Sequence, residues 1–155
     1  MENETDSALF DVSDNTALVC VDHDQYQKAV VPQLIDLSYK VNLGVNEEDI
    51  SVKLRAYSYH VVIIYENFRG STLATNPVLR ELGARPGADR REHFVVLLTH
   101  RFATNDSMSA FALSVDQIVN VADLSNLKPI LRRGTAQHFE MYHSFHSTLK
   151  SSRAM

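Results

Sequence analysis

The chain has five short apolar runs that alternate with more polar segments. This alternation sets the strongest limit on how the chain can fold. The runs span residues 17–22, 41–45, 60–65, 93–99 and 116–121. Three of them are continuous rather than alternating (ALVCVD, HVVIIY and HFVVLLT), which is typical of strands covered on both faces. Amphipathic helices between such strands predict βαβ units with right-handed crossovers. We therefore predict an α/β fold with a doubly wound, five-stranded parallel sheet between two layers of helices.

The segments between the runs carry helix signals. Asn46 is placed to cap one helix, and a short helix is predicted around Pro77–Leu82. A helix around Ser125–Arg133 has Pro129 in its first turn and Gly134 as its predicted stop. The helix after the fourth run has three apolar residues on one side, namely Met108, Phe111 and Ala112.

Length and composition divide the chain into three parts. With 155 residues and 45% hydrophobic content, it fits one globular domain with a single core. Residues 1–16 are acidic and polar, and we expect a flexible tail there. Residues 17–133 hold the alternating pattern. Residues 134–155 are predicted to form a C-terminal helical extension.

Charge and cysteine content narrow the function classes. The net charge of −4 argues against a general binder of nucleic acid. Arg80, Arg85, Arg90 and Arg91 form a local basic cluster, read as a solvated loop or as an edge that meets an acidic partner. Cys20 is the only cysteine and lies within an apolar run, so we expect a buried, reduced thiol. No apolar stretch approaches the roughly 20 residues that span a bilayer, and no signal peptide is evident, so a cytoplasmic protein with no membrane partner is expected.

In a doubly wound sheet, chemistry gathers beyond the carboxyl ends of the strands. Polar residues follow four of the predicted strands at that position. They are Asp22-His23-Asp24, Tyr65-Glu66-Asn67, Thr99-His100 and Asn120-Val121.

This set resembles the receiver domain of bacterial response regulators, over roughly residues 17–133. The resemblance implies a CheY-like, flavodoxin-like three-layer sandwich with a phosphoacceptor aspartate at the end of the third strand. That position falls on Tyr65, or on Glu66 with a slip of one residue. The family's acidic pair falls on Asp22 and His23, with Asp24 next, and its Thr falls on Thr99. Its Lys-Pro pair falls on Asn120 and Val121; Lys128-Pro129 lies beyond the strand and is read as the start of a helix.

The departures from the family pattern fall where its reactivity lies. Phosphorylation of an aspartate needs a carboxylate nucleophile, a cation held by carboxylates and a positive charge near the phosphoryl group. Tyr65 is a phenol, whose ordinary pKa is about 10, and not a carboxylate nucleophile. Asn120 carries no positive charge for the phosphoryl group. Glu66 is either a permanent mimic of a phosphorylated residue or a carboxylate exposed to water at a strand end. We expect no catalytic residue.

Two groups of residues have side chains of metal-ligand type. Asp22 and Asp24 retain oxygen ligands for a cation such as Mg²⁺, and the sequence Asp22-His23-Asp24 has ligand types that suit zinc or manganese. A relic acidic pocket is preferred, with no metal and no cofactor. His138, His143 and His146 could also bind zinc, but an exposed helix that carries histidines is preferred.

The C-terminal segment carries an apolar stripe at helical spacing, made by Phe139, Tyr142, Phe145 and Leu149. The helix either packs back on its own domain or offers a surface to a partner or a second subunit. By resemblance, a second face, formed by the fourth helix, fifth strand and fifth helix of a receiver, runs through residues 105–133. A homodimer through either surface is one interpretation of these patterns.

The sequence thus predicts a degenerate receiver, or pseudo-receiver, that binds an unidentified protein partner in two-component signal transduction independently of phosphorylation. Two alternatives stay open. One is a small ligand-binding, nucleotide-binding or enzymatic domain that uses His23, Tyr65, Glu66 and His100 in the strand-end crevice. The other is an unconventional receiver that is still phosphorylated on Asp22 or Glu66.

Overall fold

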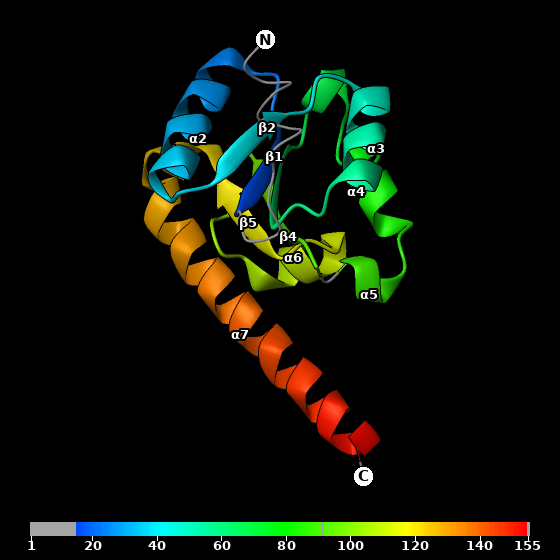
Figure 1. Cartoon of the computed structure of the whole chain (residues 1–155). Coiled ribbons are helices and arrows are strands. Elements are labelled where there is room, and N and C mark those ends of the chain that lie inside the picture. Colours follow the sequence, from blue (N-terminus) through cyan, green and yellow to red (C-terminus); the bar gives the residue numbers. More distant parts are fainter. Residues whose placement is uncertain (1–14, 91, 155) are drawn as a thin grey trace.

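The sheet has five parallel strands in the order β2-β1-β3-β4-β5, with helices on both faces (Figure 1). The computed structural model describes residues 15–90 and 92–154; for Ala88 and residues 141–154 it describes the backbone only. The strands are β1 (Thr16–Cys20), β2 (Lys40–Leu43), β3 (Val61–Tyr65), β4 (Phe94–Thr99) and β5 (Gln117–Asn120). The predicted α/β fold and its strand assignments are confirmed.

Within the described residues, seven helical elements connect and flank the strands before the last helix begins. In chain order they are α2 (Asp24–Asp36), α3 (Glu47–Ala56), η1 (Phe68–Gly70), α4 (Pro77–Gly83), α5 (Gly87–Arg90), α6 (Ser107–Leu113) and η2 (Val121–Asn126). The chain then enters α7 (Leu127–Ala154). Local capping explains several helix starts. Asn46 accepts a hydrogen bond from the Asp49 N–H at 2.8 Å, as predicted for a cap.

Two apolar cores lie on the two faces of the sheet. Alternate strand residues such as Ala17, Val19, Val61 and Ile63 pack with α2 and with the first turns of α7. Their neighbours in sequence, such as Leu18 and Val62, pack with α3, α4 and α6. Because each strand is covered on both faces, its sequence is a continuous apolar run rather than an alternating one.

The thiol of Cys20 lies in the second core and is fully buried, as predicted. Burial raises the pKa of the Cys20 thiol far above its usual range. The thiol therefore stays protonated and unreactive, and its contribution is packing.

The predicted helix stop at Gly134 is wrong, because α7 runs without a break through this residue to Ala154. A Cβ atom at Gly134 would lie 2.8 Å from Oε1 of Gln117 and 2.9 Å from Cζ of Phe94. The glycine thus serves a close approach of helix to sheet rather than a turn. Beyond the sheet, α7 projects away from the rest of the chain (Figure 1).

The predicted tail, residues 1–16, falls outside the described residues except for Asn15 and Thr16, and Thr16 already belongs to β1. Within the described ranges, no helix combines the length and the apolar character needed to cross a bilayer.

Candidate functional site

Four rings lie together at the carboxyl edge of the sheet, beside the topological switch point between β1 and β3. We call His23, Tyr26, Tyr65 and His100 the aromatic cluster. His23 stacks on Tyr26 with ring centroids 3.8 Å apart, and Tyr26 lies 5.4 Å from Tyr65. The Tyr65 hydroxyl and Nε2 of His100 are hydrogen-bonded at 2.8 Å. Ring packing therefore occupies the edge where a receiver would bind its phosphoryl group.

Tyr65 is the last residue of β3 and pairs with Leu98 of β4. Its side chain is 8% exposed. Burial raises the pKa of the Tyr65 phenol, and the nearby Tyr26, Glu66 and Asp22 raise it further. Tyr65 is thus a neutral hydrogen-bonding group near neutral pH and not a nucleophile.

Glu66 turns inward, so the expectation of a carboxylate exposed to water is wrong. Its side chain is 2% exposed. Oε1 of Glu66 accepts hydrogen bonds from the Thr99 hydroxyl at 2.9 Å and from the His100 N–H at 2.6 Å. Nε of Arg101 lies 3.6 Å from Oε2. Glu66 and Thr99 therefore satisfy each other and join the ends of β3 and β4.

Asn76 stabilises the same region, although the sequence reasoning did not single it out. The residue is 1% exposed, and its amide donates to the carbonyl oxygens of Tyr65 at 2.9 Å and Glu66 at 3.2 Å. Its carbonyl oxygen accepts from the N–H groups of Val78 and Leu79. The pair Asn76-Pro77 is a local signal for a helix start, but the two bonds to the end of β3 have no local signature.

The residues of Asp22-His23-Asp24 point in three directions. Asp22 accepts a hydrogen bond from the Arg69 N–H at 3.0 Å, where Arg69 has a left-handed φ of 58°. His23 caps α2 by accepting from the Tyr26 N–H at 3.3 Å. Asp24 pairs with Lys28 at the surface, at 3.0 Å. Among the residues with described side chains, no three His, Cys, Asp or Glu groups gather as a metal site.

Asn120, at the position of the family's lysine, has a local role. Its side chain caps η2 by accepting from the Ala122 N–H at 2.9 Å and donates to the Phe102 carbonyl at 2.8 Å. These bonds hold Asn120 within the segment around η2 and the loop after β4, and among the described residues Asn120 makes no hydrogen bond to Tyr65 or Glu66. Of the seven predicted pocket residues, the structure brings together His23, Tyr65, Glu66 and Thr99, with Asp22 at the border.

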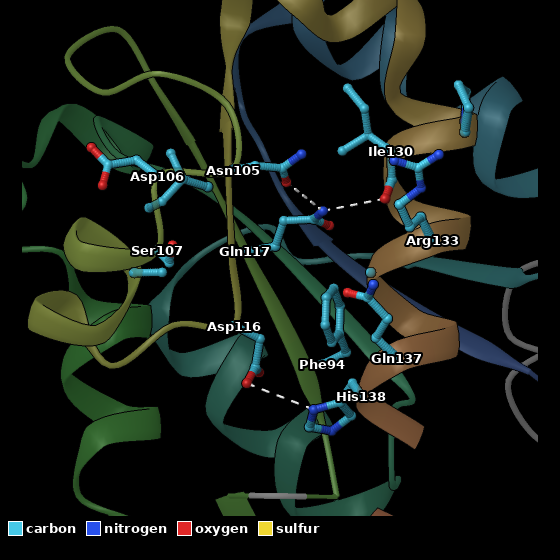
Figure 2. Close-up of a pocket in the computed structure, with 14 residues that line it drawn as sticks. Phe94, Asn105, Asp106, Ser107, Asp116, Gln117, Ile130, Arg133, Gln137 and His138 are labelled. Atoms are coloured by element: carbon cyan, nitrogen blue, oxygen red, sulfur yellow. Dashed lines mark hydrogen bonds and ion pairs between the residues drawn. The ribbon is translucent and has the colours of Figure 1, made fainter. Parts of the chain in front are cut away.

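A second candidate site is a groove between α6, β5 and α7, which we call the α6-β5-α7 groove. It has a volume of about 680 Å³ and includes Phe94, Asn105, Ala110, Gln117, Ile130 and Arg133 among its lining residues. Figure 2 shows Gln117 between Asn105 and Ile130, with His138 beside Asp116. The groove falls on the face predicted from residues 105–133.

Beside this groove, α6 presents two large apolar side chains to solvent. Met108 is 81% exposed and Phe111 is 85% exposed. The apolar side predicted for this helix therefore faces outward rather than into the core. Large apolar side chains exposed next to a groove are a feature of binding surfaces.

The predicted interaction stripe on α7 is described only at its first member. Phe139 is partly buried against the first core, and its ring lies 6.3 Å from that of His60. This part of α7 packs back on its own domain. The side chains of Tyr142, Phe145 and Leu149, like those of His143 and His146, lie outside the described residues. His138 pairs with Asp116 at 3.8 Å.

Of the basic cluster, Arg90 has a structural role. Its guanidinium lies 3.2 Å from Asp116 and donates to the Ser114 carbonyl at 2.8 Å. It therefore ties the loop before β4 to the start of β5.

Comparisons with known proteins support the fold. No family model and no curated protein sequence matches this chain. A solved DNA-binding response regulator of the LuxR family from Staphylococcus aureus is similar in structure, with a TM-score of 0.56 and 20% identity over 78% of this chain and 98% of that one. A fusion containing a trimeric coiled-coil segment of yeast Spc42 has a TM-score of 0.62 and 16% identity, over 94% of this chain and 93% of that one. The chain therefore has a receiver-like fold.

Proposed function

We propose that this protein is a pseudo-receiver: a non-catalytic protein-protein interaction module in signal transduction that acts independently of phosphorylation. The observation that carries the proposal is Tyr65, which stands at the phosphoacceptor position with its hydroxyl bonded to His100. A phenol in this setting cannot replace the aspartate that forms an acyl phosphate.

The surroundings of Tyr65 support the same proposal. Glu66, the nearest carboxylate in sequence, is buried and already accepts from Thr99 and His100. Asn120 provides no positive charge for a phosphoryl group and is held in a helix cap. Asp24, which would have to help Asp22 hold a cation, instead pairs with Lys28 in solvent. The nucleophile, the cation site and the positive charge are thus all altered.

The binding surface proposed for a protein partner is the α6-β5-α7 groove with its apolar neighbours, Met108 and Phe111. These two side chains would lose most contact with water in a complex, and burial of a large apolar side chain contributes about 1.5–3 kcal/mol. A cytoplasmic location is part of the proposal.

The test is exposure of the pure chain to Mg²⁺ with beryllium fluoride, and separately with acetyl phosphate. We expect no phosphoryl adduct by intact-protein mass spectrometry and no shift of the Thr99 and His100 amide signals by NMR. The positive control is the triple variant His23→Asp, Tyr65→Asp, Asn120→Lys, which restores the family's residue types. An adduct on the unaltered chain, on Asp22, Glu66 or elsewhere, refutes phosphorylation independence.

The alternative of a ligand-binding or enzymatic crevice has a separate readout. A thermal shift with a nucleotide, flavin or metal panel that disappears in a Tyr65→Phe or His100→Gln variant would favour it. The aromatic cluster fills that edge with side chains, so we expect no shift.

A further inference from the structure

The net negative charge of this protein comes from one short segment. Residues 1–14 carry five carboxylates and no Lys or Arg, so the net charge of −4 becomes +1 when they are set aside. The carboxylates belong to Glu2, Glu4, Asp6, Asp11 and Asp14. Between them lies an apolar pair, Leu9-Phe10. Such charge asymmetry within one chain indicates an interacting segment.

The complementary charge lies on α7. Its sequence has five basic residues (Lys128, Arg132, Arg133, Lys150 and Arg153) and a single acidic one, Glu140. Arg133 lines the α6-β5-α7 groove and is exposed. Its guanidinium makes no ion pair with any residue whose side chain is described.

The acidic residues of the groove, by contrast, are already bonded. Asp106 accepts from the Ser109 N–H at 3.0 Å and from the Ser109 hydroxyl at 2.8 Å. Asp116 accepts from the Val95 N–H at 2.8 Å and lies beside Arg90 and His138. Neutral donors therefore hold Asp106 in place, Asp116 has Arg90 as its ion-pair partner, and Arg133 is the groove cation without an ion pair among the described side chains. The groove walls also include apolar surface from Phe94, Pro129 and Ile130.

The acidic segment joins the domain close to α7. The Thr16 N–H donates to Nδ1 of His60 at 3.2 Å, and the His60 ring contacts Phe139 of α7. From β1 to β5 the sheet spans three strand spacings, or about 14 Å. Fourteen extended residues reach about 46 Å, so the segment is long enough to cross the sheet edge and enter the groove.

We propose that residues 1–14 bind in the α6-β5-α7 groove, with their carboxylates near Arg133 and Arg132 and with Leu9-Phe10 over the apolar wall. A tethered segment has an effective concentration on the order of millimolar, so an intrinsic Kd of about 1 mM would keep the groove about half occupied. The segment would then compete with a protein partner for the same face. Only this consequence depends on the proposed function; the binding itself does not.

The test uses the full chain with a nitroxide spin label on the cysteine of a Ser7→Cys variant. The native Cys20 is fully buried, so the label attaches at position 7. Paramagnetic broadening of amide signals in isotope-labelled protein then reports where the segment lies. We expect broadening at Ser107, Ile130 and Arg133 at low salt. It should be lost in 1 M salt, where the Debye length falls to about 3 Å. It should also be lost in Arg133→Glu but kept in the matched variant Arg80→Glu on α4.

Several results would overturn the inference. Broadening spread evenly over α3 and α4 as well as the groove, or unchanged by Arg133→Glu, contradicts a specific site. A mixture of isotope-labelled chain without a spin label and spin-labelled chain without isotopes tests for contact between copies. Broadening in this mixture that is lost on dilution would show that the segment of a second copy occupies the groove. A phosphoryl adduct would refute the proposed function and leave these results untouched, so the two failures are distinguishable.

Discussion

Replacing Gly134 with alanine sets two effects of opposite sign against each other. In a helix interior, alanine is favoured over glycine by about 1 kcal/mol. The added Cβ, however, would lie 2.8 Å from Oε1 and 2.9 Å from Nε2 of Gln117, and 2.9 Å from Cζ of Phe94. These distances are too short, so α7, the amide or the ring must move.

The cost of that movement is larger than the gain. Gln117 and Phe94 are buried although they line the groove, and forcing buried side chains out of their positions costs about 1–3 kcal/mol. If the Gln117 amide moves, it also loses its bonds to Asn105 and Ile130, at 2.9 and 3.2 Å, each contributing about 1 kcal/mol. Oε1 of Gln117 accepts no hydrogen bond from the described residues, so no bond to this oxygen offsets its close contact with the added Cβ. We expect a net loss of about 2 kcal/mol.

Urea unfolding followed by circular dichroism measures this loss. With an m-value of about 2 kcal/mol/M, the midpoint should fall by about 1 M. Gly83→Ala is the matched control, because a Cβ at the end of α4 would meet nothing within 4 Å. That variant should be as stable as the parent or slightly more stable. A Gly134→Ala protein at least as stable as the parent would refute the packing argument.

Two other changes test the site and its surroundings. Asn76→Ala removes four hydrogen bonds from a buried position. The free energy of unfolding, measured with urea, should fall by about 2–4 kcal/mol, against about 1 kcal/mol for Asn46→Ala at a more exposed cap. Equal losses in the two variants would contradict the bridging role of Asn76. Burial lowers the pKa of His93 in the folded protein. In the unfolded chain the imidazole has its ordinary pKa of about 6.5, so below this pH the unfolded state binds more protons than the folded state. The free energy of unfolding should therefore decline as pH falls through about 6.5. His93→Asn keeps a donor for the Tyr59 carbonyl but does not titrate, so a pH dependence of unfolding as steep as that of the parent would contradict this assignment.

The sequence predicts the strands well because both faces of each strand are buried, and burial on both faces leaves a continuous apolar run. It also predicts the Asn46 cap, since a cap and its acceptor lie within one turn. The direction of Glu66 has no such local signal. Its partners, Thr99 and His100, come from the next strand in the sheet, more than thirty positions along the chain.

At Gly134, contacts from distant parts of the chain override a local signal. Within its own segment, a glycine after a basic pair indicates a helix end. The deciding contacts come from Gln117 and Phe94, which only the assembled sheet places beneath α7. The outward position of Met108 and Phe111 is likewise set by the tertiary structure, because periodicity identifies an apolar side of a helix but not what it faces.

The unbroken course of α7 has a mechanical consequence. Its first turns are fixed by Leu127, Leu131 and Phe139 in the first core, and the helix then continues to Ala154. At 1.5 Å per residue, the part beyond Phe139 is about 22 Å long. A rotation of about 10° at the anchored end would move the far end by about 4 Å. A small repacking of the first core would therefore appear as a displacement of several ångströms at the far end of α7.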